Sequence, residues 1–78
     1  MEIYLKKLLF KASHRGTKEM DIILGSFAEK NLETMNDENL KLFEEILEIP
    51  DPDLYKWFAS EDVSIPEKYT ALVKEILK

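Results

Sequence analysis

The sequence predicts an all-α protein, a compact antiparallel bundle of five helices in a single domain over residues 1–78. Apolar residues recur three and four positions apart in every segment, and no stretch alternates with a period of two long enough to predict a strand. Prolines and polar capping residues divide this helical pattern into short segments. At 78 residues the chain is too short for two cores, and short connections favour antiparallel neighbours.

The pattern places the helices at about residues 3–14, 18–30, 37–48, 52–59 and 66–77. Gly16 is expected to end the first helix in the left-handed conformation of a C-terminal cap, which glycine adopts without a Cβ clash. Thr17 then caps the second helix. Gly25 lies in the middle of that helix, where glycine costs about 1 kcal/mol relative to alanine. We therefore expect another helix to approach closely at Gly25.

Capping signals also mark the last three helices. Asn36, followed by two acidic residues, predicts the N-terminus of the third helix. Asp51 is expected to cap the fourth helix, with Pro52 at its first position. Ser64 and Pro66 predict the same arrangement for the fifth.

The aromatic residues follow the helical spacing. Trp57 is expected in the core, because it falls in register with other apolar residues of its segment. Tyr4, Tyr55 and Tyr69 are expected at the rim, with their hydroxyls in water.

Composition excludes several classes of function. A net charge of -5 argues against general nucleic-acid binding, which depends on clustered Lys and Arg. Without cysteine there is no disulfide framework and no thiolate zinc site. The apolar start of the chain is interrupted by Lys6, Lys7 and Lys11, lacks the small-residue cleavage site of a signal peptide and is shorter than a membrane span requires. We expect a cytoplasmic protein with no membrane contact.

No constellation of residues predicts catalysis. Most acidic residues lie at expected helix starts or on polar faces, where dipole compensation and solubility explain them. Ser13 and His14 are adjacent in sequence, but adjacent residues on a helix do not face each other. The histidine and carboxylate spacing matches no metal site, and Gly16 and Gly25 form no phosphate-binding loop. We therefore expect no catalytic, cofactor-binding or metal-binding residues.

The segment SHRGTKEMD, residues 13–21, holds the only histidine and one of the two glycines. One interpretation is structural: His14 and Arg15 complement a helix dipole, Gly16 is a cap, and Glu19 lies in the first turn of the next helix. The alternative is a docking patch. A glycine leaves a depression at an exposed corner, while Arg15 and Glu19 offer a fork of donors and a carboxylate to another protein.

The motif RGTKEMD resembles the R-G-x-x-E motif of the small succinate dehydrogenase flavinylation factors, the SdhE type of bacteria and their mitochondrial relatives. The similarity continues through ILGSFAEKNL and FEEILEIPDPDLYKW, with the family's order and spacing over nearly the whole chain. The resemblance implies a chaperone-like assembly factor, not an enzyme. Such a factor binds the flavoprotein subunit of succinate dehydrogenase, or of fumarate reductase, and promotes covalent attachment of FAD to that subunit.

By this resemblance the factor carries no cofactor of its own, and FAD is attached to its client. The partner-binding residues are expected to be Arg15, Gly16 and Glu19, with His14, Thr17 and Lys18 at the edge of the contact. Asp51, Asp53 and Trp57 are assigned mainly to capping and core. The absence of a transit peptide points to a bacterial member, and we expect a monomer when it is free.

An antitoxin or regulatory module is the alternative function. The helix pair around Gly16 superficially resembles a helix-turn-helix. The helix that would enter the DNA groove, however, presents Glu19, Asp21 and Glu29 to the phosphates, which is repulsive. This favours a protein partner over DNA.

Overall fold

The computed structural model describes residues 2–59 and 64–78, and the chain over these ranges folds into helices without strands. The all-α class is confirmed, and the predicted boundaries are met within one residue. The antiparallel packing of all neighbours stays a prediction. The elements are α1 (Ile3–Ser13), α2 (Lys18–Asn31), a short 3-10 helix η1 (Leu32–Thr34), α3 (Asp37–Leu47), α4 (Asp51–Ala59) and α5 (Glu67–Ile76).

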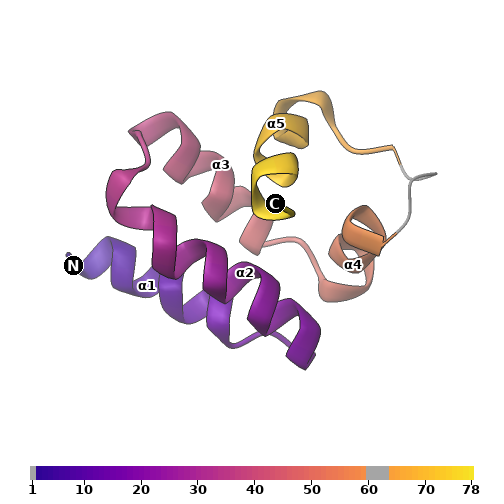
Figure 1. Cartoon of the computed structure of the whole chain (residues 1–78), viewed down its shortest axis with the longest axis horizontal. Coiled ribbons are helices and arrows are strands. Elements are labelled where there is room, and N and C mark those ends of the chain that lie inside the picture. The colour runs from indigo at the N-terminus through magenta and orange to yellow at the C-terminus, as the bar shows by residue number, and fades with distance from the viewer. Residues whose placement is uncertain (1, 60–63) are drawn as a thin grey trace.

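The helices pack around one hydrophobic core. Helices α1 and α2 lie side by side, α3 packs against α1 and α5, and α5 also reaches α2. Helix α4 follows α3 closely and lies at one end of the molecule, near the corner where α1 meets α2 (Figure 1). The core is made of the apolar faces of these helices: Leu8, Ala12, Met20, Leu24, Ala28, Leu32, Leu40, Phe43, Ile46, Leu47, Leu54, Tyr69, Leu72, Val73 and Ile76.

The aromatic residues are placed differently from the prediction in two cases. Trp57 packs against the core but is only partly buried, with its ring centroid 5.8 Å from that of Tyr69. Tyr69 is buried and not at the rim, and its hydroxyl donates to Glu45 Oε1 at 2.6 Å. The hydrogen bond explains the difference, because a protein acceptor replaces the water that a buried hydroxyl would lose. Tyr4 and Tyr55 are exposed as predicted, although the Tyr4 hydroxyl donates to Glu44 Oε1 at 3.1 Å.

The predicted close approach at Gly25 is confirmed. A Cβ atom at this position would lie 2.9 Å from Ser13 Oγ and 3.4 Å from Ser13 Cα, at the last residue of α1. Glycine therefore lets α2 pack against the end of α1, which offsets its low helix propensity.

Two of the predicted N-terminal caps are confirmed. Asn36 Oδ1 accepts from the Asn39 amide at 2.8 Å, and Thr17 Oγ1 accepts from the Met20 amide at 3.3 Å. The other two predictions are wrong. Helix α4 already includes Asp51, and α5 begins at Glu67 after Pro66, with no side-chain cap.

Among the described helices, none combines the length and apolar character that crossing a bilayer requires.

Replacing Gly25 with leucine should lower the free energy of unfolding by about 1–3 kcal/mol, because the added side chain forces α1 and α2 apart. Ser26→Leu, at an exposed position of the same helix, is the matched control. Urea denaturation followed by circular dichroism measures both variants. Equal midpoints for the two would show that contact with α1 does not restrict residue 25.

Candidate functional site

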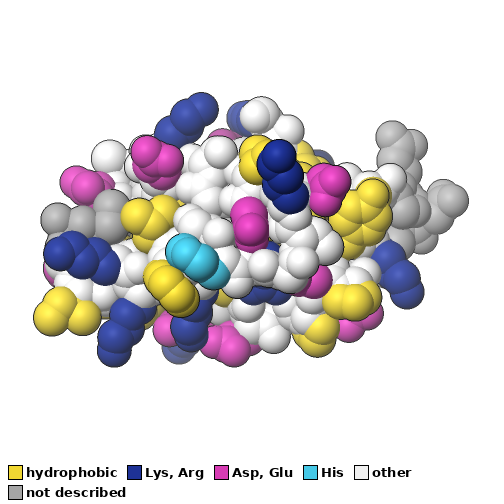
Figure 2. Space-filling view, turned by 90° about the horizontal axis from the view of Figure 1, so that it is seen from below, with side chains coloured by type: hydrophobic (Ala, Val, Ile, Leu, Met, Phe, Trp, Pro, Cys, Tyr) yellow, Lys and Arg dark blue, Asp and Glu magenta, His cyan; other side chains and the backbone are white. Residues whose placement is uncertain are grey.

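The connection between α1 and α2 forms an exposed corner that begins at His14. The His14 Nδ1 atom lies 2.9 Å from the Phe10 carbonyl oxygen, and its ring stacks on the Phe10 ring at 4.0 Å between centroids. A carbonyl only accepts, so Nδ1 carries the hydrogen in this bond. Figure 2 shows the histidine on the surface next to a hydrophobic side chain. Here His14 satisfies a carbonyl of the last turn of α1.

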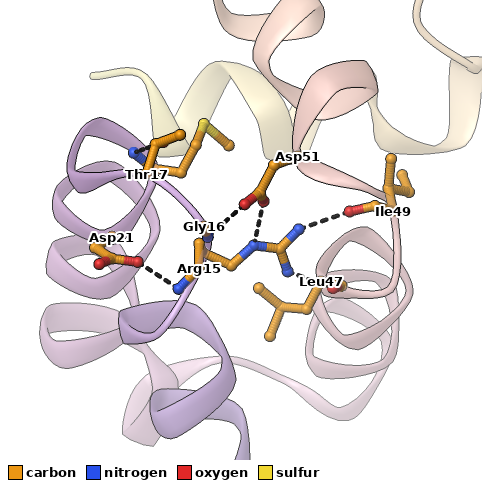
Figure 3. Close-up of polar contacts among 8 residues, drawn as sticks. Arg15, Gly16, Thr17, Asp21, Leu47, Ile49 and Asp51 are labelled. Carbon is orange, nitrogen blue, oxygen red and sulfur yellow. Dashed lines mark hydrogen bonds and ion pairs between the residues drawn. The ribbon is translucent and has the colours of Figure 1, made fainter.

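Arg15 turns its guanidinium into the protein (Figure 3). Its Nε donates to Asp51 Oδ1 at 2.7 Å, Nη2 donates to the Ile49 carbonyl at 2.6 Å, and Nη1 donates to the Leu47 carbonyl. The side chain is only 9% exposed. The expectation that Arg15 offers its fork of donors to a partner is therefore wrong for this structure. The physical reason is that the end of α3 and the start of α4 supply acceptors for all three nitrogens.

These contacts complete the end of α3. Leu47 is the last residue of that helix, so its carbonyl is among the four that have no partner within the helix. A cation at a helix C-terminus also complements the helix dipole. Arg15 thus ties the α1–α2 corner to the α3–α4 connection, 32 to 36 residues away in sequence.

Asp51 is the acidic partner in this arrangement. Its Oδ1 accepts from Arg15 Nε and its Oδ2 accepts from the Gly16 amide at 2.5 Å. Burial by itself raises the pKa of the Asp51 carboxyl, but the bonds from the Gly16 amide and the Arg15 guanidinium outweigh it, so the pKa lies below its usual value. The prediction that Asp51 caps its own helix is wrong: its carboxylate binds Arg15 and Gly16, and the Asp53 and Leu54 amides donate to the Pro50 carbonyl instead.

Gly16 has a role different from the one expected. Its φ is not positive, so it is not a left-handed cap. A Cβ atom here would lie 2.8 Å from Asp51 Oδ2. Glycine suits this position because a Cβ atom would displace the Asp51 carboxylate that accepts from the Gly16 amide.

The start of α2 is held by two side chains, those of Asp21 and Thr17. The Asp21 side chain accepts from the Arg15 amide, and Thr17 caps the helix. Because Arg15 is held through both its backbone and its side chain, the orientation of the first turn of α2 follows from the Arg15–Asp51 pair. Figure 3 shows these contacts converging on residues 15 and 16.

The other predicted contact residues take no part in the hydrogen bonds that link Arg15, Gly16 and Asp51. Thr17, Lys18 and Glu19 are exposed, as is His14. Glu19 lies in the first turn of α2, so its carboxylate is favoured by the helix dipole. The motif thus contains Arg15, whose guanidinium is turned inward, an exposed Gly16 whose amide binds Asp51, and the exposed Glu19. Contact of these residues with a partner stays a prediction.

A pocket that sequence reasoning missed lies beside Glu19. It has a volume of about 370 Å³ and is lined by Thr17, Glu19, Met20, Asp51, Pro52 and Tyr55. Residues from α2 and α4 meet there because the Asp51–Gly16 bond joins the starts of the two helices. Nothing in a local pattern pairs residue 19 with residue 55. The one feature of the sequence that could have indicated this pocket was Tyr55, a tyrosine expected at the rim one helical turn after Asp51.

The described residues contain no group of three or more His, Asp or Glu side chains arranged to hold a metal ion. The corner presents the exposed Glu19 carboxylate and a pocket with apolar lining. This combination suits contact with another protein.

Comparison with known proteins places the chain in a family. Residues 6–78 match the Sdh5 family model, described as flavinator of succinate dehydrogenase. The chain is 41% identical over 73 residues to the FAD assembly factor SdhE of Acetobacter pasteurianus, covering 94% of this chain and 67% of that protein. It is 33% identical over 73 residues to the mitochondrial succinate dehydrogenase assembly factor 2 of Dictyostelium discoideum, covering 94% of this chain and 51% of that protein.

The chain belongs to the Sdh5 family, as its motif predicted. A second bacterial relative, the FAD assembly factor SdhE of Pectobacterium atrosepticum, is 39% identical over 57 residues, covering 73% of this chain and 65% of that protein. The chain spans about two thirds of the length of these bacterial relatives and about half that of the Dictyostelium protein. No solved structure matches it.

Replacing Arg15 with methionine should destabilise the fold by about 2–4 kcal/mol, because it leaves two carbonyls without their partner and the Asp51 carboxylate without its counter-ion. The matched control is Lys11→Met. It removes the exposed Lys11–Glu48 pair and should cost no more than about 1 kcal/mol. Chemical denaturation of both variants measures the difference. An equal, small loss in the two would mean that the Arg15 contacts do not stabilise the fold.

Asp51 should make stability depend on pH in the acid range. Its folded pKa is lowered, so its contribution is complete above the unfolded value of about 3.9 and is lost as pH falls through the folded pKa. Asp51→Asn should therefore flatten the fall in unfolding free energy below about pH 4. Urea titrations from pH 6 to pH 2.5 measure the slope.

The control for this titration is Glu45→Gln, because the pKa of Glu45 is also lowered, by hydrogen bonds from Tyr69 and Lys68. The Glu45 side chain is more accessible to solvent than that of Asp51, at 36% against 19%, so this variant should change the acid slope less than Asp51→Asn. An unchanged slope in Asp51→Asn would rule out the Asp51 bonds as its cause.

Proposed function

We propose that this protein is an assembly factor that binds the flavoprotein subunit of succinate dehydrogenase, or of the related fumarate reductase, and promotes covalent attachment of FAD. The observation that carries the proposal is the division of the R-G-x-x-E motif. Arg15 and Gly16 lock a corner of the fold, and Glu19 points outward from it. Membership of the flavinator family and the names of its relatives support the same conclusion.

The proposed mechanism needs no catalytic residue on this chain. The flavin and the client supply the chemistry, and the barrier falls when the flavin and the accepting side chain are held in reacting geometry. A partner shifts a conformational equilibrium only through its differential affinity for the two states. The factor therefore binds the reactive conformation of the client more tightly than the others.

The rigidity of the corner supports this role. Binding energy is lost when side chains must be ordered at the interface. The first turn of α2 is already fixed by Thr17, Asp21 and the Arg15–Asp51 pair. Glu19 therefore reaches a partner at a defined position, with little ordering to be done on binding.

We propose a monomer when free, acting in a bacterial cytoplasm, which is consistent with a chain that lacks cysteine.

Glu19→Gln should weaken binding to the flavoprotein subunit by roughly tenfold or more, because a charge-assisted hydrogen bond is lost. Stability should stay nearly unchanged, since Glu19 is exposed. Affinity is measured with the purified flavoprotein, and covalent flavin by fluorescence of its denatured band in a deletion strain. Glu29→Gln, also exposed on α2, is the control and should behave as wild type.

Position 19 is a better test than position 16. A side chain at Gly16 displaces Asp51, so loss of binding there would not separate docking from folding. If Glu19→Gln and wild type restore covalent flavin equally and bind the subunit equally, the outward carboxylate is not a docking group.

A further inference from the structure

The pocket beside Glu19 has a definite chemical character. Its apolar surface comes from the exposed Pro52 and the half-exposed ring of Tyr55, and the fully buried Met20 lies beneath it. Of its two carboxylates, that of Asp51 is bound to Arg15 and Gly16. That of Glu19 has no ion-pair partner among the described residues. No basic residue lines the pocket.

These features fit a long side chain with an apolar stem and a cationic end. An apolar occupant would desolvate the Glu19 carboxylate without replacing its hydrogen bonds, which is unfavourable. An anionic occupant would be repelled by the same carboxylate. A guanidinium can stack on an aromatic face and donate two hydrogen bonds to a carboxylate, which an ammonium cannot do in the same geometry.

We propose that this pocket receives an arginine side chain of the flavoprotein client, with its stem on Pro52, its guanidinium over the Tyr55 ring and its donors on Glu19. The inference rests on the proposed function and deepens it, because it names the group that Glu19 binds and adds Tyr55 as a second contact. The Asp51–Gly16 bond positions the pocket by holding the starts of α2 and α4 together.

The first experiment measures affinity for the flavoprotein subunit. Tyr55→Leu should weaken binding by roughly 3- to 30-fold, because the aromatic face is lost, while Tyr55→Phe keeps it and should bind nearly as wild type. Tyr4→Leu, the same change at an exposed tyrosine outside the pocket, is the control. Circular dichroism confirms that each variant is folded.

A double-mutant cycle tests whether Glu19 and Tyr55 hold one group. Glu19→Gln combined with Tyr55→Leu should weaken binding less than the product of the two single effects, because both contact the same guanidinium. If the fold-losses in affinity of the two single variants multiply in the double variant, Glu19 and Tyr55 do not hold one shared group. Wild-type affinity in Tyr55→Leu would overturn the pocket proposal and leave the proposed function standing.

The second experiment needs no client. N-acetyl-arginine amide is titrated at millimolar concentration into the labelled protein, and backbone amide shifts are recorded by NMR. The shifts should concentrate at residues 17–20 and 51–55, and should shrink in Tyr55→Leu and Glu19→Gln. The neutral isostere N-acetyl-citrulline amide should cause much smaller shifts. Equal shifts with both compounds would overturn the guanidinium assignment.

Together the two experiments distinguish failure of the proposed function from failure of the pocket proposal. If wild type responds to the arginine compound but does not bind the flavoprotein, the proposed function fails, and with it the client as the source of the arginine. If wild type binds the flavoprotein but the arginine compound leaves the pocket amides unchanged, the pocket proposal fails alone.

Discussion

The ion pair between Arg15 and Asp51 is the interaction on which the rest of the structure depends. It joins two connections that lie far apart in sequence, and it does so with little exposure to water. Arg15 also satisfies carbonyls at the end of α3, and Asp51 also binds the Gly16 amide. A protein of this size buries a smaller share of its surface on folding than a larger domain does, so a polar link of this kind helps to fix how the helices are arranged.

This link explains why a short motif combines residues with such different exposure. Arginine supplies several donors in a fixed fork, and glycine permits the approach of the carboxylate that the arginine holds. Changes at either residue act on a partner indirectly, by moving the first turn of α2. The glutamate three residues after the glycine is exposed on that turn, so its carboxylate can meet a partner without disturbing the Arg15–Asp51 pair.

Charge is distributed unevenly over the surface. Helix α1 carries lysines and no acidic residue between Ile3 and Ser13, whereas the pocket between α2 and α4 carries carboxylates and no lysine or arginine. An asymmetric field orients a charged partner before contact, and this effect is lost at high salt. The net charge alone says nothing about this asymmetry.

Local sequence determined the helices, because periodic apolar residues and caps such as Asn36 and Thr17 act within a few positions. The motif also led to the family and to the corner as the candidate site. Tertiary structure decided what each residue does there: that Arg15 points inward, that Gly16 makes room for Asp51, and that Tyr55 lies beside Glu19. These roles depend on contacts across 35 or 36 residues, and side-chain partners at that separation leave no periodic signal in a single sequence.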